Sequence, residues 1–195
     1  MVAGYHLIWT AYGFWLPNDP RGSTSLEVRV EALKGLGQLH YGRKTVQPLS
    51  CEMREFFDQA KEVLTDPVMT FTDDDILFLG DILGREIISK RYTCYACAVM
   101  PDHVHLLIRR HKDSAEEMIE HFQEATRDAL IAEGKRPPNH PVWTKGRGWT
   151  GFLNTRADFQ REIEYIRQNP IKIGKPEQKW EFVKVYDGWL PGFRG

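Results

Sequence analysis

Residues 92–109 read YTCYACAVMPDHVHLLIR, which is two apolar runs joined by the turn-forming tripeptide MPD at positions 100–102. The second run alternates cleanly, with Val104, Leu106 and Ile108 on one face of a strand and His103 and His105 on the other. Two strands joined by a tight turn must pair antiparallel. The stretch therefore predicts a β-hairpin that carries two histidines on one face.

Further strands and helices are expected on both sides of this hairpin. The helix patterns carry start and stop signals, among them a capping box that begins at Ser114, a cap at Thr155 and a stop at Pro170. Interleaved strands and helices around an antiparallel hairpin indicate an α+β fold with helices packed on the sheet. The other expected strands cover residues 5–14, 142–154 and 181–186, and the expected helices cover residues 52–64, 73–89, 115–131 and 156–169.

The chain is 195 residues long and 42% hydrophobic, which suits one well-packed domain. No apolar run is long enough to span a membrane, and the N-terminus lacks the pattern of a signal peptide. We therefore expect a cytoplasmic protein with no membrane partner. The three cysteines are an odd number, and Cys94 and Cys97 lack a second pair at zinc-site spacing, so reduced structural thiols are expected.

The net charge of -1 hides a strong asymmetry along the chain. Residues 52–86 hold ten acidic side chains against three basic ones, whereas residues 135–184 hold eleven basic against five acidic. Nucleic-acid binding needs Lys and Arg near phosphates, so the basic third is compatible with it. A solvated acidic helix beside a basic one explains the same pattern, so charge supports a DNA-binding role without establishing it.

Two groups of residues carry candidate chemistry. His103 and His105 lie two apart in a strand, so both imidazoles project from one face and form half of a metal site; the alternative is a pair of surface histidines. In the last helix, Tyr165 and Asn169 are four apart and share a face outside the apolar stripe. A tyrosine with Arg161, Glu162 and Asn169 as neighbours on the helix suits phosphate chemistry.

The segments MPDHVHLLI (residues 100–108) and YIRQNP (residues 165–170) together resemble the single-tyrosine HUH transposases, in particular the REP-associated tyrosine transposases and their insertion-sequence relatives. The likeness covers most of the chain in order, beginning at YHLIW (residues 5–9). It implies a ferredoxin-like αβ sandwich, one domain over residues 1–195. It also implies a metal-dependent single-stranded DNA endonuclease and strand transferase, a transposase that acts through a 5′-phosphotyrosine intermediate.

The resemblance also assigns roles to residues. Tyr165 would be the nucleophile, and His103, His105 and Asn169 would hold a divalent cation, Mg²⁺ or Mn²⁺. Two imidazoles and an amide suit Mn²⁺ or a later metal better than Mg²⁺. Asn169 precedes Pro170, so it is alternatively a helix C-terminal residue with no ligand role. A free tyrosine has a pKa of about 10, so the phenol needs activation, for which the metal and Arg161 are candidates.

The DNA partner would be single-stranded, with hairpin structure, and the protein nucleoid-associated when bound to it. Basic residues with interleaved aromatic ones suit a single strand, although a packed aromatic edge and a structural turn are the alternatives. A helical acidic insertion around residues 22–89 is longer than compact relatives need, so both a monomer and a homodimer are open. The candidate DNA contacts are Arg21, Trp143, Lys145, Arg147, Trp149 and Arg161.

Two competing functions remain open at the level of sequence. One is a DNA-hairpin binding protein that is catalytically silent, motivated by the near-neutral charge and by the doubtful ligand role of Asn169. The other is a metal-dependent phosphoester hydrolase that shares only the His-x-His site, with Tyr165 as a packing residue. Only chemistry on DNA separates these functions, because all three keep the same fold.

Overall fold

A computed structural model describes residues 1–23, 27–28, 31–42, 44–146 and 148–192 of the chain. Within it the chain forms two compact units. The first comprises Met1–Trp9, Thr70–Pro138 and Gly146–Gly195, and the second comprises Thr10–Met69 and Asn139–Lys145. The organisation expected from sequence, one domain with an insertion around residues 22–89, stays a prediction.

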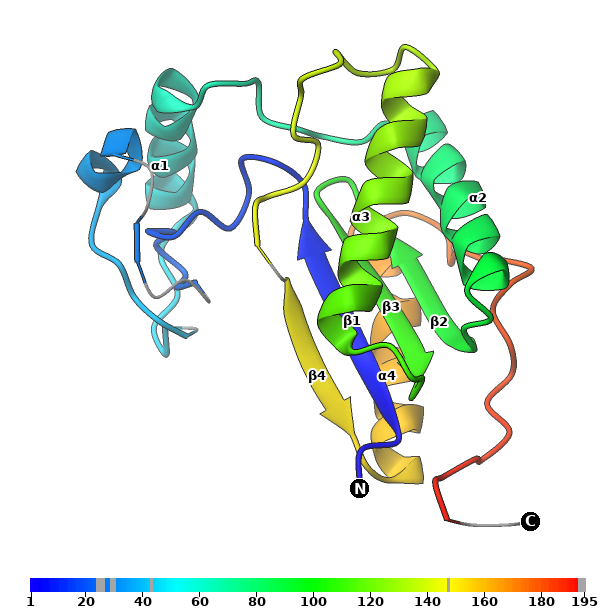
Figure 1. Cartoon of the computed structure of the whole chain (residues 1–195). Coiled ribbons are helices and arrows are strands. Elements are labelled where there is room, and N and C mark those ends of the chain that lie inside the picture. The colour runs from blue at the N-terminus through cyan, green and yellow to red at the C-terminus, as the bar shows by residue number, and fades with distance from the viewer. Residues whose placement is uncertain (24–26, 29–30, 43, 147, 193–195) are drawn as a thin grey trace. The chain divides into compact units, whose positions relative to one another are not determined.

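The first unit is built on a four-stranded antiparallel sheet with the strand order β2-β3-β1-β4 (Figure 1). The chain enters the sheet at a central strand, adds the predicted hairpin on one side and returns to the other edge. This is the ferredoxin-like order, and it confirms the predicted α+β class. The strands are β1 (Gly4–Thr10), β2 (Cys94–Val99), β3 (His103–Arg109) and β4 (Trp149–Leu153).

Helices cover both faces of this sheet. The helices α2 (Asp73–Ser89) and α3 (Ala115–Ala132) pack side by side on one face, and α4 (Arg156–Lys172) lies on the other (Figure 1). Each of the three begins with a capping box, in which the N-cap hydroxyl accepts from the third helical N–H and an acidic side chain accepts from the N-cap N–H. The boundaries of α2 agree with the predicted ones to the residue.

The helix α4 ends later in the sequence than expected. It was expected to stop at Asn169, but it continues through Pro170 to Lys172. Pro170 stands in the last turn, where its missing N–H removes one hydrogen bond and few residues follow for it to disturb. Gly174, two residues after the last helical residue, turns the chain away from the helix. Its φ of 76° is left-handed, and its N–H donates to the carbonyl of Ile171.

The segment at residues 181–186 does not form the expected last strand. Among the described residues its only strand pairing is an isolated parallel bridge between Val183 and Cys94. Trp180 and Phe182 lie over α2 instead, against Gly80 and Gly84. Its aromatic and branched residues are therefore used for packing against a helix rather than for pairing.

The second unit holds a short 3-10 helix, Glu31–Leu36, and the helix α1 (Ser50–Val63). Its own core gathers Leu16, Leu33, Phe56 and Ala60. The three cysteines of the chain form no disulfide, as expected. None of the helices in the described part of the chain is both long and apolar enough to cross a membrane.

Candidate active site

The two histidines of the hairpin lie on β3 and differ in exposure. The side chain of His103 is 23% exposed, whereas His105 is only 3% exposed. Burial rules out the alternative of a plain surface histidine for His105. The rings lie close together, with centroids 4.7 Å apart. A buried imidazole needs partners for its nitrogens, and these partners come from two other elements.

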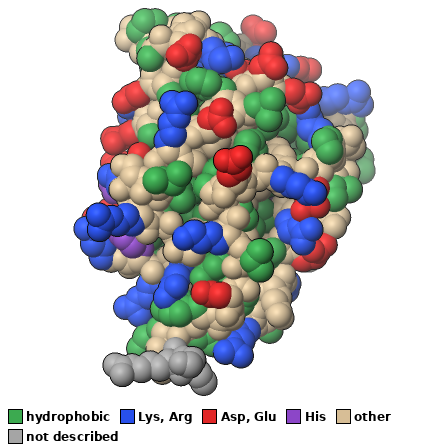
Figure 2. Space-filling view, turned by 90° about the vertical axis from the view of Figure 1, so that its right-hand side faces the viewer, with side chains coloured by type: hydrophobic (Ala, Val, Ile, Leu, Met, Phe, Trp, Pro, Cys, Tyr) green, Lys and Arg blue, Asp and Glu red, His purple; other side chains and the backbone are tan. Residues whose placement is uncertain are grey.

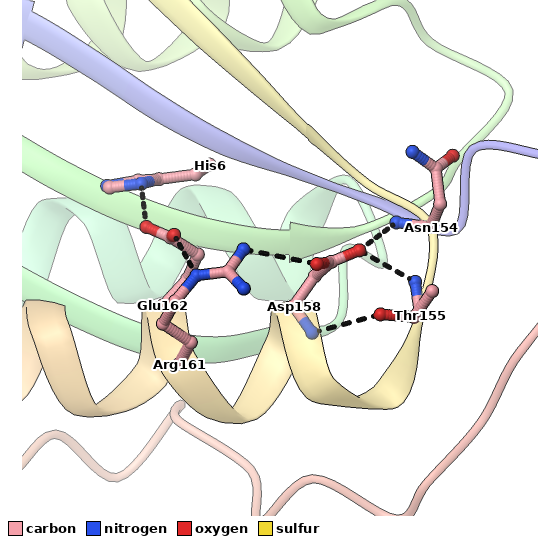
Figure 3. Close-up of polar contacts among 6 residues, drawn as sticks. All are labelled: His6, Asn154, Thr155, Asp158, Arg161 and Glu162. Carbon is pink, nitrogen blue, oxygen red and sulfur yellow. Dashed lines mark hydrogen bonds and ion pairs between the residues drawn. The ribbon is translucent and has the colours of Figure 1, made fainter.

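A chain of hydrogen bonds runs from α4 through β1 to His105. His6, on β1, contacts a carboxylate oxygen of Glu162 through Nδ1 at 3.0 Å (Figure 3). Its other nitrogen, Nε2, lies 2.9 Å from Nδ1 of His105. Glu162 belongs to α4, so one helix and two strands meet in this chain of contacts.

These contacts fix the tautomers of both rings. An ionised carboxylate only accepts hydrogen bonds, so Nδ1 of His6 carries the proton that Glu162 receives. Neutral His6 then has a lone pair on Nε2, and Nδ1 of His105 must be the donor to it. Nε2 of His105 is left with a lone pair and no proton. A histidine in this state could hold a metal through its free nitrogen while outer residues hold the other nitrogen.

The electrostatics agree with two neutral rings. Burial lowers the pKa of His6, and the nearby Glu162 opposes that effect only in part. Burial also holds the pKa of His105 well below 6.5, with further lowering from His103, His6 and Lys172. Nε2 of His105 is buried and makes no hydrogen bond among the described residues. An orphaned lone pair at this position fits a bound cation.

His103 repeats the pattern nearer the surface. Its Nδ1 lies 2.6 Å from a carboxylate oxygen of Asp102, which therefore accepts the proton on that nitrogen and leaves Nε2 for a ligand. Among the described residues no three His, Cys, Asp or Glu side chains gather as a metal site.

Asn169 is the amide that the sequence offers, and it lies inside α4 rather than at its end. The side chain is 9% exposed, and its Nδ2 donates to the carbonyl of Tyr165 at 3.0 Å. The donor nitrogen is thereby engaged with the helix, which leaves the amide oxygen as the atom for a cation. The extension of α4 past Pro170 removes the reason for regarding Asn169 as a terminal residue.

Tyr165 lies against the buried histidines. Its ring centroid is 5.8 Å from that of His105 and 6.0 Å from that of His6. The side chain is 43% exposed, so the phenol is accessible. Nζ of Lys172 stands 4.5 Å from the centre of the ring. The tyrosine, the histidine pair and one cation therefore share a single location on the α4 face of the sheet.

Arg161 takes a different part from the one expected. Its Nη2 donates to Asp158 at 3.1 Å and its Nε donates to Glu162 at 3.3 Å (Figure 3). The guanidinium thus joins the helix cap to the carboxylate that holds His6. The cation beside Tyr165 is Lys172, which the sequence pattern did not single out.

The six candidate DNA contacts fall into different parts of the chain. Trp149 lies on the edge strand β4, 48% exposed and 5.8 Å from the ring of His6, so it borders the histidine site. Arg21, Trp143 and Lys145 belong to the second unit, and Arg147 lies outside the described residues.

Two of the candidates in the second unit are already engaged. Trp143 is 4% exposed, so it offers no stacking surface, and the alternative of packed aromatic residues describes it. The guanidinium of Arg21 pairs with Asp19 at 2.8 Å and lies over the ring of Trp15. Lys145 is exposed.

Sequence reasoning did not single out His6 or Lys172, and it placed Glu162 beside Tyr165 without its partner His6. His6 carried a signal, because it is a polar residue within an aromatic and branched strand. Glu162 and Lys172 lie on the helix of Tyr165, at positions three before and seven after it, which is one and two turns away. The sequence therefore shows that both lie on the same face of the helix as Tyr165, but it does not show which residues of other elements they contact.

Two solved structures are similar to this chain. One is the structure of a REP-associated tyrosine transposase bound to a REP hairpin, with a TM-score of 0.47, 11% identity, and coverage of 88% of this chain and 68% of that one. The other is a protein of Deinococcus radiodurans assigned as a transposase, with a TM-score of 0.38, 19% identity, and coverage of 85% and 91%. No protein-family model and no curated protein sequence matches the chain.

Proposed function

We propose that the protein is a metal-dependent single-stranded DNA endonuclease and strand transferase of the single-tyrosine HUH type. Tyr165 is its nucleophile, and His103, His105 and Asn169 are the ligands of a divalent cation. DNA with hairpin structure is its partner, and Trp149 is the aromatic contact at the site.

The observation that carries this proposal is the orphaned Nε2 of His105. It is buried, the hydrogen-bond chain leaves it without a proton, and the centroid of its ring lies 5.8 Å from that of an accessible tyrosine. A surface histidine pair needs no such arrangement of outer residues. A packing tyrosine would lie in the apolar stripe of α4, where Phe159 and Ile166 are 0% exposed, and not beside a cation and two imidazoles.

In the proposed reaction the phenol oxygen of Tyr165 attacks a backbone phosphorus. The tyrosine loses its proton, a bond forms between its oxygen and the phosphorus, and the bond from phosphorus to the 3′ oxygen breaks. The departing oxygen takes a proton and becomes a free 3′-hydroxyl, so the 5′ phosphate stays on the enzyme. A divalent cation at the ligands would stabilise charge that develops on the phosphate. Lys172 places a positive charge 4.5 Å from the centre of the ring of the attacking tyrosine.

The test is formation of a covalent protein–DNA product that survives denaturation. Labelled single-stranded and hairpin oligonucleotides from the DNA that flanks the gene are incubated with the protein and Mn²⁺. We expect a shifted band on a denaturing gel that disappears on chelation and in Tyr165→Phe. The matched control is Tyr41→Phe, because Tyr41 is 65% exposed and lies in the second unit.

The other results decide among the competing functions. Tight binding of the hairpin with no covalent band in the wild type would establish a silent binding protein. Turnover of a simple phosphoester that is unaffected in Tyr165→Phe would establish a hydrolase. A band that persists in Tyr165→Phe would exclude Tyr165 as the nucleophile.

A further inference from the structure

A second polar pocket opens in the first unit, away from the histidine site. It lies where α2 ends, where the chain leaves β3 and where α3 begins, and its volume is about 640 Å³. None of its residues belongs to the site of Tyr165. Cationic and histidine side chains dominate its lining, which includes Lys90, Arg91, Lys112, His111, His121 and Asp113.

The single carboxylate of the pocket is held by its neighbours. Oδ2 of Asp113 accepts from the hydroxyl of Tyr92 at 2.7 Å and lies 3.3 Å from Nδ1 of His111. The phenol uses its only O–H to donate to Asp113, so its oxygen accepts from Nδ1 of His121 at 2.9 Å. The hydroxyl of Tyr92 lowers the pKa of Asp113, so this carboxylate is an ionised structural part of the wall.

Two of the cations have no acidic partner. Lys90 pairs with Glu86 at 3.7 Å, whereas Arg91 and Lys112 form no ion pair within the described part of the chain. The lining thus combines three cations, Lys90, Arg91 and Lys112, with one carboxylate, Asp113, whose pKa Lys112 helps to lower. Unpaired cations beside histidine donors are suited to a phosphate oxyanion.

The backbone conformation of Arg91 supports a binding role for its side chain. Arg91 has a φ of 59°, and it ends α2 in a motif in which its N–H donates to Ile88 and that of Tyr92 donates to Ile87. This left-handed position favours glycine, because any Cβ is strained there. The chain holds an arginine at the position and turns it into the lining of the pocket. A strained residue that lines a pocket points to a binding role.

Figure 2 shows Lys and Arg side chains gathered beside His side chains at one edge of the face that it draws, which also carries many acidic side chains. The formal net charge is only -1, so a polyanion is attracted only where cations are concentrated. The lining holds three cationic side chains and two imidazoles, so the donors for phosphate oxygens outnumber the rings on which a base could stack.

We propose that this pocket binds backbone phosphates of the DNA on which the Tyr165 site acts, and this rests on the proposed function. The pocket and His103 lie at opposite ends of β3, which at about 3.3 Å per residue spans roughly 20 Å. That length corresponds to about six base-pair steps of duplex. The ligand is thus a DNA long enough to have a stem as well as a reactive strand.

The test removes the two unpaired cations without disturbing the fold. Arg91→Gly places the favoured residue at the left-handed position, and Lys112→Gln removes the second charge. The control, Lys179→Gln with Lys184→Gln, removes two exposed charges elsewhere in the first unit. Fluorescence anisotropy with a labelled hairpin should show affinity at least about tenfold lower in the pocket variant and within twofold of the wild type in the control. Equal affinity in both variants would overturn the proposal.

Further measurements separate the phosphate sources and the two proposals. If inorganic phosphate shifts the NMR signals of His111 and His121 while hairpin affinity is the same in the pocket variant, the site takes a small anion and the DNA assignment is wrong. A covalent band on a short single strand is expected to persist in the pocket variant. Hairpin affinity that depends on the pocket, with no band from any variant, would leave the pocket standing and remove the proposed function.

Discussion

His105 illustrates how one residue acquires a function through residues far away in the sequence. Its partner His6 is 99 positions away, and the Glu162 that holds His6 is 156 positions from it. Each contact in this chain fixes the next proton, and the result is an unprotonated Nε2 on a buried ring. The metal affinity of the site should therefore depend on Glu162, which is not a ligand.

Glu162→Ala should weaken Mn²⁺ binding by roughly 10- to 100-fold, the usual range for outer residues of a metal site. Glu162→Gln keeps an acceptor for His6 and should retain most of the affinity. Titration followed by electron paramagnetic resonance measures both, and nitrogen NMR of the histidines reports the tautomer of His105 directly. The control is Glu164→Ala, an exposed carboxylate of the same helix. Equal losses at both positions would show that helix charge, and not the hydrogen-bond chain, sets the affinity.

At the scale of elements, α2 is fitted to the segment that follows α4. A Cβ added to Gly80 would stand 2.0 Å from the ring of Trp180, so the helix face is shaped for that side chain. Gly80→Ala should destabilise the protein by roughly 1–3 kcal/mol because the site is overpacked. With Trp180→Ala already present, the same change should stabilise it by up to about 1 kcal/mol, since alanine is the better helix former. Urea unfolding of the four proteins measures this reversal of sign, and a destabilising effect in both backgrounds would contradict it.

The N-terminal cap of α4 makes a prediction about pH. Asp158 accepts from the backbone N–H groups of Asn154 and Thr155, and these bonds lower its pKa to about 2. A folded pKa below the unfolded value of about 3.9 means that the stabilisation is present above that value and is lost as the pH falls toward 2. Asp158→Asn should cost on the order of 1 kcal/mol at neutral pH. The difference in stability between Asp158→Asn and the wild type should shrink as the pH falls toward 2. The control Asp128→Asn, on α3, should be as stable as the wild type at every pH. Thermal unfolding against pH checks it, and a constant gap would mean that shape and not charge is responsible.

For the molecule as a whole, most local sequence signals predicted the right element, with the helix stop expected at Pro170 as an exception, whereas contacts between distant segments were not predicted. Caps and apolar spacing predicted the helices, and the alternation of residues 103–109 predicted the strand that carries the histidines. Residues 181–186 have a strand-like composition, yet they pack on α2, because the choice between pairing and packing depends on neighbours brought by the fold. His6 and Glu162 were unpredictable as a pair for the same reason. The histidine pair, and the pair Tyr165 and Asn169, could be proposed from sequence because each pair lies within one element.

The charge distribution of the whole molecule predicts how its DNA binding responds to salt. The formal net charge is -1. The proposed pocket brings two cations, Arg91 and Lys112, to the DNA, and the Tyr165 site brings one, Lys172. Two or three phosphate contacts correspond to a loss of affinity of roughly 10- to 50-fold between 50 and 200 mM salt, against 10³-fold or more for six to ten contacts. Anisotropy with the labelled hairpin over this range gives the slope, and the variant Arg91→Gly with Lys112→Gln should lower its magnitude by about 2. A slope of 6 or more in the wild type would mean that further cations contact the DNA. The first to replace would then be Lys145, an exposed cation of the second unit.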